Sequence, residues 1–491
     1  MRTKNIFNPK KLILLVFVGL IGLSGCKKFL DINQNPNNPN VVEPNLLLPI
    51  TQAGISQVIG NSLQVYGGMW SQFWTQGPSA NQYKSIDLYA PVNTDSDRPW
   101  SNLYSKALIN SQLIIDNKGS NLEFVKGMAY LMKAYSFQVA TDAFGDIPLA
   151  EALDKDNARP KYATQELVYD SVFKWIDKGV ALFAATGSNN PGAQDLFFQG
   201  DIAKWKAFAN TLKLKAYLRI SKVNSAKASA GITALYATNP TFLTQDVSLK
   251  YTSVGGNDNP LYNEIVALQG AQNLVASSTV VNQFIANGDQ RRFKFFVLRS
   301  KQTEITSIPQ GSYNANVGKL VSLPSGLVGA NPSSSSNAAL APVKIFSSSE
   351  SYFLQAEAAA RGWGNGDITS LFTKGITESF TATGITDATV VANYLATAKD
   401  GPLALAAAGS TEAKVKAIIT QKYYAMCGFQ GFEAWTEYRR TGYPDFLTLS
   451  AAPPSATKRP ERMIYPNSEA IYNSSFPGNV DIFVPVWWAK K

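Results

Sequence analysis

The chain has 491 residues, of which 45% are hydrophobic, 11% aromatic and only 16% charged, and it contains no histidine. The lack of histidine excludes Ser-His-Asp and Cys-His nucleophiles and removes the commonest metal ligand, and two cysteines are too few for a thiolate zinc cage. The formal net charge of +10 is spread along the chain without a dense basic stripe, so we predict no binding to nucleic acid.

The chain begins with a secretory signal. A basic start is followed by the apolar run Leu12–Leu23 and by two small residues before Cys26, which is the three-part pattern of a signal peptide. The sequence Leu23-Ser24-Gly25-Cys26 resembles a bacterial lipobox, in which the cysteine is acylated and becomes the new N-terminus. We therefore expect removal of residues 1–25 and lipid anchoring through Cys26. The alternative is an ordinary signal peptide with an accidental cysteine.

Residues 26–49 are predicted to form an extended tether. The stretch Asn33–Asn40 alternates asparagine and proline without helical or strand periodicity, which is typical of turns and extended chain. The remainder, residues 50–491, is expected to be a single domain with a regular scaffold and a large irregular part.

Helical periodicity dominates this domain, as where Phe124, Met128 and Leu131 recur on one helix face. The predicted helices form four consecutive pairs: Ser101–Asn117 with Leu122–Ala143, Gln165–Ala185 with Asp201–Ser221, Ser347–Arg361 with Ile368–Ala382, and Glu412–Cys427 with Phe432–Arg440. Such pairs indicate a mostly α-helical, stacked scaffold of helical hairpins, although no tetratricopeptide consensus is legible in them.

One of these helices carries signals at both ends. Asp201 is placed to cap its N-terminus. Lys213, Lys215 and Arg219 lie toward its C-terminal end, where positive charge is favoured by the helix dipole.

Three stretches lack helical rhythm and are rich in Gly, Ser, Asn or Pro. These are Thr238–Gln272, Lys301–Pro342 and the chain after Ala451. They are predicted to form the irregular part.

The segment Tyr66–Trp100 combines aromatic rings with amide and charged side chains. A sugar presents flat C–H faces and a rim of hydroxyls, so a site for it needs this set of side chains. The predicted ligand-binding residues are Trp70, Trp74, Asn81, Tyr83, Tyr89 and Arg98. The competing interpretation places Trp70 and Trp74, spaced i and i+4, in a core stripe, and Trp100 with Tyr104 has the same spacing.

A second candidate wall of the site is formed by Asn257–Asn259 with Tyr262, and by Gln269–Asn273. Its polar residues suit contacts to ligand hydroxyls. A solvated turn is the equal alternative.

An EF-hand is suggested by the alternation of Asn93, Asp95 and Asp97. The loop would need Gly and Glu where Arg98 and Tyr104 stand, so this motif is rejected. We predict no cofactor and no metal centre, and leave only an adventitious or structural calcium open.

A glycoside hydrolase would need two carboxylates facing each other across a cleft. Glu350 and Glu357 share a helix face, but Glu357 stands at i, i+4 from Arg361 and is interpreted as a salt bridge. Glu433 and Glu437 precede an arginine pair in a similar way. We therefore predict no catalytic residue and a binding protein rather than an enzyme, with a hydrolase as the less favoured alternative.

Several short motifs follow one another in a characteristic order over almost the full length. They are Cys26–Asn33, Thr141–Pro148, Glu433-Ala434-Trp435, Arg439–Pro444, Arg462–Pro466 and Trp487-Trp488. In this order they resemble the SusD/RagB family of outer-membrane nutrient-binding lipoproteins, and especially its SusD-like second branch. One departure is Asp289-Gln290-Arg291, where the family usually carries proline in the middle.

The resemblance implies a right-handed superhelical scaffold of four tetratricopeptide-like helical hairpins that carries a large, loop-rich lobe. It also implies capture of oligosaccharides at the cell exterior and their delivery to a SusC-like TonB-dependent outer-membrane barrel, on which the protein acts as a lid. Capture of peptides, as by RagB-like proteins, is the alternative. On this interpretation the protein is lipid-anchored in the outer membrane.

Overall fold

The computed structural model describes residues 43–154, 156–157, 159–252, 256–331, 335–453 and 457–490. The signal, Cys26 and most of the expected tether lie outside these residues. Helix α2 (Pro44–Gly60) begins at Pro44, so residues 44–49, which we expected in the tether, are helical. Within the described ranges, no helix is both long enough and apolar enough to cross a membrane.

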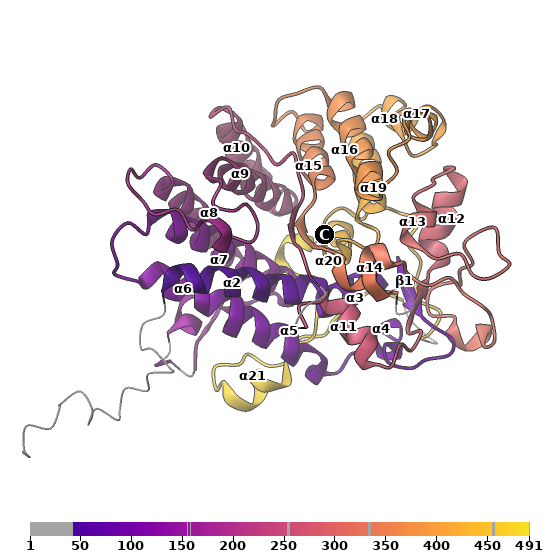
Figure 1. The fold of residues 1–491 in the computed structure, drawn as a ribbon, viewed down its shortest axis with the longest axis horizontal. Coiled ribbons are helices and arrows are strands. Elements are labelled where there is room, and N and C mark those ends of the chain that lie inside the picture. Colours follow the sequence, from indigo (N-terminus) through magenta and orange to yellow (C-terminus); the bar gives the residue numbers. More distant parts are fainter. Residues whose placement is uncertain are drawn as a thin grey trace, which may run out of the picture. The chain divides into compact units, whose positions relative to one another are not determined.

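Helices make up most of the fold, and the four predicted pairs are all present (Figure 1). The first pair consists of α5 (Asp97–Asn102), a π-helical turn η3 (Leu103–Leu108) and α6 (Ile109–Asp116), which run on into one another, with α7 (Glu123–Phe144). The others are α8 (Gln165–Leu182) with α9 (Ile202–Arg219), α15 (Ser348–Ala360) with α16 (Ile368–Ala382), and α19 (Thr411–Met426) with α20 (Gly431–Thr441). The members of each pair contact one another, which confirms the predicted hairpins.

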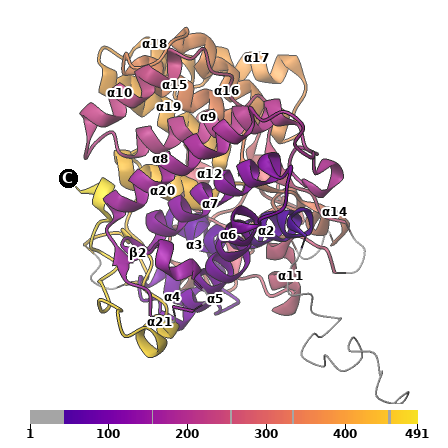
Figure 2. The same ribbon diagram turned by 90° about the vertical axis from the view of Figure 1, so that its left-hand side faces the viewer.

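The hairpins stack into an array. Helix α8 contacts both α7 and α9, α9 contacts α15, and α15 contacts α19. Figure 2 shows α9, α8, α7 and α2 as successive tiers. In Figure 1 the array continues through α15, α16 and α19 at the top of the view, whereas α12 (Ser278–Ala286) and α13 (Arg292–Phe295) lie at its right.

Shorter helices escaped the sequence analysis. They are α12 and α13, and also α3 (Ser62–Trp70), α4 (Lys84–Asp87), α10 (Ser225–Tyr236), α11 (Pro260–Ala267), α14 (Ser335–Leu340), α17 (Ala388–Thr397), α18 (Pro402–Ala406) and α21 (Asn467–Tyr472). Helix α11 lies in a stretch that we expected to be irregular. It forms because the Oδ1 of Asn259 accepts hydrogen bonds from the backbone N–H of Leu261 and Tyr262, and because Pro260 suits the first helical position.

Three two-stranded antiparallel ladders complete the described part of the chain. They are β1 (Trp74–Gln76) with β5 (Leu274–Ala276), β2 (Ile147–Pro148) with β3 (Tyr162–Ala163), and β4 (Val247–Leu249) with β6 (Val343–Phe346). In the first ladder Thr75 lies opposite Val275. This pairing brings the two segments that we proposed as walls of a binding site side by side.

The N-terminal cap of α9 is confirmed, because the Asp201 carboxylate accepts a 3.1 Å hydrogen bond from the backbone N–H of Lys204. The cationic end of α9 is not a solvated helix end, however. Lys215 and Arg219 are buried and pair with carboxylates of other helices, whereas only Lys213 reaches an exposed partner, Asp177.

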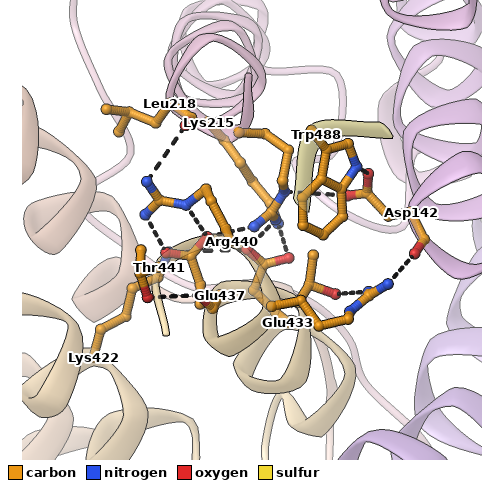
Figure 3. A network of polar contacts seen from close by, with 12 residues as sticks. Asp142, Lys215, Leu218, Lys422, Glu433, Glu437, Arg440, Thr441 and Trp488 are labelled. Carbon is orange, nitrogen blue, oxygen red and sulfur yellow. Dashed lines mark hydrogen bonds and ion pairs between the residues drawn. The ribbon is translucent and has the colours of Figure 1, made fainter. Parts of the chain in front are cut away.

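Figure 3 shows the ionic network that these two cations enter. The Nζ of Lys215 lies 2.8 Å from Glu433 and 3.2 Å from Glu350. Arg219 contacts Glu433, Glu437 and Asp142. The network therefore ties α9 to α7, α15 and α20 in the interior of the scaffold.

Arg440 of α20 extends the same network to Glu357 of α15. Its guanidinium pairs with Glu357 and with Glu437, each at 2.6 Å, and Glu357 also pairs with Arg361 at 2.8 Å. The predicted Glu357–Arg361 salt bridge is thus confirmed. Glu433 is different, because its partners are on α9 and α19 and not the arginines that follow it.

Helices α3 and α20 approach so closely that a side chain would not fit between them. A Cβ added to Gly67 would lie 2.1 Å from the backbone nitrogen of Phe432, well inside van der Waals contact. The close crossing sets the ring of Trp70, at the end of α3, 4.7 Å from that of Trp435 on α20. The end of α3 is therefore fixed to the helical scaffold.

Candidate functional site

A cleft of about 210 Å³ opens where α3, α4 and the start of α5 meet α11. Its lining includes Val65, Tyr66, Gln82, Tyr83, Ser85, Ile86, Asp95, Arg98 and Glu264. The cleft thus combines the edges of aromatic and aliphatic side chains with hydroxyl, amide, carboxylate and guanidinium groups.

One hydrogen-bonded trio spans the cleft. The Tyr83 hydroxyl donates a 2.6 Å hydrogen bond to Oε1 of Glu264, and Nη1 of Arg98 lies 3.2 Å from Oε2 of the same carboxylate. Burial and the Glu264 carboxylate raise the pKa of Tyr83 well above its ordinary value of 10. The hydroxyl therefore stays protonated and remains a donor. Arg98 is the solvent-exposed residue of this trio, with 54% of its side chain exposed.

A second hydrogen-bonded pair, Tyr66 with Asp95, also lines the cleft. The Tyr66 hydroxyl donates a 3.1 Å hydrogen bond to Oδ2 of Asp95, and the backbone N–H of Val92 donates to the same oxygen at 3.0 Å. Burial and the Asp95 charge raise the pKa of Tyr66. Asp95 is half-buried, and a carboxylate carries more acceptor sites than these two donors occupy, so it can still accept from a ligand.

The position of Tyr83 is set by amide side chains behind it. Its backbone N–H donates to Oε1 of Gln76 at 2.7 Å. The Oδ1 of Asn273 accepts from the backbone N–H of Gln82 at 2.9 Å and from Nε2 of Gln76 at 3.3 Å. Asn273 belongs to the second predicted wall, so this wall supports the first one rather than standing apart from it.

A buried carboxylate, Asp87, lies next to these amides. It accepts hydrogen bonds from the Thr75 hydroxyl (2.7 Å), the backbone N–H of Gln76 (2.8 Å) and Nε2 of Gln310 (2.6 Å). Burial raises the pKa of Asp87 to about 6 even though these donors act in the opposite direction. Asp87 holds β1 to α4 and so positions the cleft wall without reaching the cleft itself.

The two predicted tryptophans belong to the core. Trp70 is 3% exposed and Trp74 is 1% exposed, so neither offers a ring face to a ligand in this structure. Trp70 donates from Nε1 to the carbonyl of Ile86 at 3.2 Å and lies edge-on to Tyr66. Both Ile86 and Tyr66 line the cleft, so Trp70 supports the site from behind.

The remaining two predicted residues lie outside the cleft lining. The Tyr89 ring is buried, and its hydroxyl accepts a 3.0 Å hydrogen bond from the backbone N–H of Ser450. Asn81 is exposed, and its carbonyl accepts from the backbone N–H of Lys84. Of the six predicted ligand-binding residues, Tyr83 and Arg98 are the ones that the fold brings into the cleft.

The sequence profile of the family described as "Starch-binding associating with outer membrane", the SusD-like second branch, matches residues 36–466. The chain belongs to this SusD-like family. No protein of the curated set matches it.

Solved structures of SusD homologues share the fold. A chitin-binding protein is 24% identical with a TM-score of 0.74 over 91% of this chain and 100% of its own. A chitin-binding SusD homologue from Flavobacterium johnsoniae is 22% identical with a TM-score of 0.74 over 91% and 97%. A SusD homologue from Bacteroides uniformis is 23% identical with a TM-score of 0.75 over 92% and 100%. The mostly helical, tetratricopeptide-like scaffold expected for a SusD-like protein is thereby confirmed.

The carboxylates weighed for hydrolysis are not arranged across a cleft in this SusD-like chain. Glu350, Glu357, Glu433 and Glu437 are all buried in the ionic network. Their negative charges are balanced by neighbouring lysine and arginine side chains. Members of the SusD-like family are binding proteins, and this pairing of the carboxylates is what a structural role requires.

The residues weighed for calcium point to separate partners. Asn93 donates to the carbonyl of Tyr465, Asp97 accepts from the backbone N–H of Ser468, and Asp95 belongs to the Tyr66 pair. Among the residues that the structure describes, no group of three or more Asp, Glu or Cys side chains is placed to hold a metal ion.

Sequence reasoning missed Glu264, which organises the cleft of this SusD-like protein. The signal that could have found it is the amphipathic pattern of α11, where Leu261 and Ile265 are buried and Glu264 is the acidic residue beside them. Asn259 and Pro260 mark the start of that helix. An acidic residue on a short helix between two predicted wall segments is a candidate for the site.

Proposed function

We propose that this SusD-like protein captures oligosaccharides at the exterior of the outer membrane and delivers them to a partner TonB-dependent transporter, on which it acts as a lid. The observation that carries this proposal is the cleft built on Tyr83, Glu264 and Arg98. The family description supports it, and so do two structural relatives that are chitin-binding proteins.

The cleft chemistry suits sugar hydroxyls. The Glu264 and Asp95 carboxylates accept hydrogen bonds from hydroxyl groups, Arg98 donates to them, and Gln82 does both. Tyr66 and Tyr83 add apolar ring surface to the lining, against which the C–H groups of a sugar can pack. At about 210 Å³, the cleft is smaller than the ~300–1,000 Å³ of sites that enclose a whole small ligand. It is therefore suited to hold part of a polymer whose remainder extends outside.

Binding is tested by calorimetric titration of the purified protein with maltoheptaose and chitohexaose. Glu264→Gln keeps the shape of the side chain but removes its charge, so it is expected to weaken binding by about tenfold, which corresponds to ~1.4 kcal/mol. Glu166→Gln, at an exposed position on α8, is the matched control and should bind like the wild type. The proposal fails if neither these sugars nor acidic oligosaccharides bind. Binding of a set of short peptides instead would favour the peptide alternative.

Capture without cleavage is the second part of the proposal. Long incubation of the protein with the bound oligosaccharide should release no new reducing ends. Any cleavage of the sugar, whether or not Glu264→Gln abolishes it, would mean that the protein is a hydrolase and not only a capture protein.

The anchor and the transporter partner are tested in cells. Cys26→Ser should abolish acyl labelling and release the protein from the membrane fraction. Crosslinking of intact cells followed by gentle detergent extraction should recover a much larger outer-membrane protein with the wild type. Recovery of the uncrosslinked chain alone would contradict the lid function.

A further inference from the structure

A second hollow lies beyond the cleft, and it has a different charge. Its volume is about 300 Å³, and its lining includes Ser79, Gln272, Arg299 and Lys319. Neither Asp nor Glu belongs to its lining. The cleft, by contrast, contains the carboxylates of Asp95 and Glu264 with the single cation Arg98.

The two hollows are neighbours on the molecule. A small space between them shares Tyr83 with the cleft and Gln272 with the second hollow. Its volume of about 10 Å³ is too small to admit a sugar. An oligosaccharide in the cleft would therefore reach Arg299 and Lys319 over the surface, past the exposed side chains of Gln82 and Gln272.

The cations of the second hollow are available for a ligand. In the part of the chain that the structure describes, the Arg299 guanidinium makes no hydrogen bond or ion pair. The Nζ of Lys319 donates one hydrogen bond, 3.0 Å long, to the carbonyl of Ser307, and an ammonium has three N–H groups to donate. Two cations without a nearby counter-charge favour an anion.

The floor of the second hollow is packed, and it anchors the backbone next to both cations. Val275 and Val321 line the hollow and form a buried apolar cluster with Ile308 and Leu323. The backbone N–H of Val297 donates to the carbonyl of Leu323 at 2.9 Å. Arg299 and Lys319 each stand two residues from this floor, one beyond Val297 and the other before Val321.

We propose that the second hollow is a subsite for an acidic sugar unit, which carries a carboxylate or a sulfate ester, in the oligosaccharide that the cleft holds. This proposal rests on the proposed capture function and deepens it. A guanidinium binds either anion through two parallel hydrogen bonds, and the ammonium adds a point charge. The carboxylates of the cleft repel such an anion, so the acidic unit is directed to the second hollow.

The test compares acidic and neutral oligosaccharides of one length. The probes are tetragalacturonate, a sulfated galactan tetrasaccharide and maltotetraose, titrated into the purified full chain. The first two distinguish carboxylate from sulfate as the recognised group. We expect at least one acidic probe to bind more tightly than maltotetraose, and its affinity to fall with added salt because mobile ions screen the attraction.

The decisive variant is Arg299→Gln with Lys319→Gln, which keeps polarity and approximate length but removes both charges. It should weaken the acidic probe by about tenfold or more, abolish its salt dependence and leave maltotetraose binding unchanged. The matched control, Lys206→Gln with Lys222→Gln, removes two exposed charges from α9 and the turn after it and should behave as the wild type. Melting curves verify that both variants are folded.

The outcomes separate the two proposals. If maltotetraose binds but neither acidic probe binds better, or if both double variants lose acidic binding equally, the acidic subsite is overturned while the capture function stands. If no oligosaccharide binds to the folded protein, the capture function fails and the subsite fails with it. Acidic binding that the Arg299 and Lys319 variant alone removes supports the subsite.

Discussion

Tyr83 donates a 2.6 Å hydrogen bond to Glu264, and this contact joins two segments that are 181 residues apart in the sequence. The segment of Tyr83 follows β1, and Glu264 lies on α11, shortly before β5. Because β1 pairs with β5, both segments start from one ladder and close over the same cleft. The hydrogen bond is therefore both a structural lock and part of the binding surface.

Tyr83→Phe removes the hydroxyl and keeps the ring. A hydrogen bond to a charged group contributes about 1.5–3 kcal/mol, so we expect the free energy of unfolding to decrease by this amount. Urea unfolding measures this change. Tyr472→Phe is the control, because the side chain of Tyr472 is 76% exposed and its hydroxyl should be dispensable. Equal stability losses in the two variants would contradict the assigned hydrogen bond.

Trp74→Ala tests the assignment of this ring to the core. Truncation of a buried tryptophan costs about 3–5 kcal/mol. Trp74 is 1% exposed, and its ring packs closely against Gly68. A large drop in melting temperature is therefore expected, with a smaller drop for Trp74→Phe. A Trp74→Ala protein that melts like the wild type but no longer binds sugar would show that the ring belongs to the binding site and not to the core.

The scaffold was predictable because its helices are long and their apolar faces repeat. A pattern such as Phe124, Met128 and Leu131 needs only local sequence to be read. The sequence offers less for α11, whose start depends on Asn259 and Pro260 alone within a stretch of turn-forming residues. Short helices that depend on one cap do not show enough periods to be recognised.

The candidate cleft draws on the predicted segment, but only Tyr83 and Arg98 of the six predicted residues line it. Trp70 and Trp74 have helical spacing, yet α3 ends at Trp70, Gln72 adopts φ of 64°, and Trp74 begins β1. Both rings are covered by residues far away in sequence, such as Trp435 against Trp70. Which aromatic residue faces a cleft is decided by such distant contacts. The burial of Lys215 escaped prediction for the same reason.

The buried Asp87 predicts a dependence of stability on pH. Burial raises the pKa of Asp87 to about 6 in the folded protein, whereas an unfolded chain releases this proton near pH ~3.9. Between these values the folded state binds more protons, so stability contributed by protonated Asp87 is full below about pH 3.9 and is lost as the pH rises through 6. A shift of about two units corresponds to roughly 3 kcal/mol.

Asp87→Asn should remove this component. The measurement is the free energy of unfolding from pH 4.5 to 7, compared between the wild type and the variant. The fall in the free energy of unfolding over this range should be shallower in Asp87→Asn than in the wild type. The control Asp258→Asn, in the polar stretch 257–259, should keep the wild-type slope. Parallel curves for Asp87→Asn and the wild type would show that Asp87 is ionised throughout.

The close crossing of α3 and α20 predicts intolerance of a single methyl group. In Gly67→Ala the new Cβ would lie 2.1 Å from the Phe432 backbone nitrogen, which cannot move like a side chain. Overpacking typically costs about 1–3 kcal/mol, and we expect at least this loss in urea unfolding. Gly409→Ala is the control because its Cβ would meet nothing within 4 Å. A neutral Gly67→Ala would mean that the helices can separate.

The ionic network predicts different effects of two lysines on the same helix. Lys215 is 5% exposed and lies between Glu350 and Glu433, so Lys215→Met leaves two buried carboxylates without this cation. Removing one partner from a buried ion pair costs about 3–5 kcal/mol. Lys213 faces Asp177, whose side chain is 61% exposed, and Lys213→Met should cost less than about 1 kcal/mol.

A double variant then identifies the origin of the Lys215 effect. If the cost comes from the uncompensated charge, Lys215→Met combined with Glu433→Gln should be more stable than the sum of the two single changes predicts, because the buried carboxylate and its lost partner are removed together. Burial opposes ionisation of Glu433, but the charges of Arg219 and Lys215 outweigh it and lower its pKa. Additive losses would instead assign the effect of Lys215→Met to packing, since no coupling between the two charges would remain.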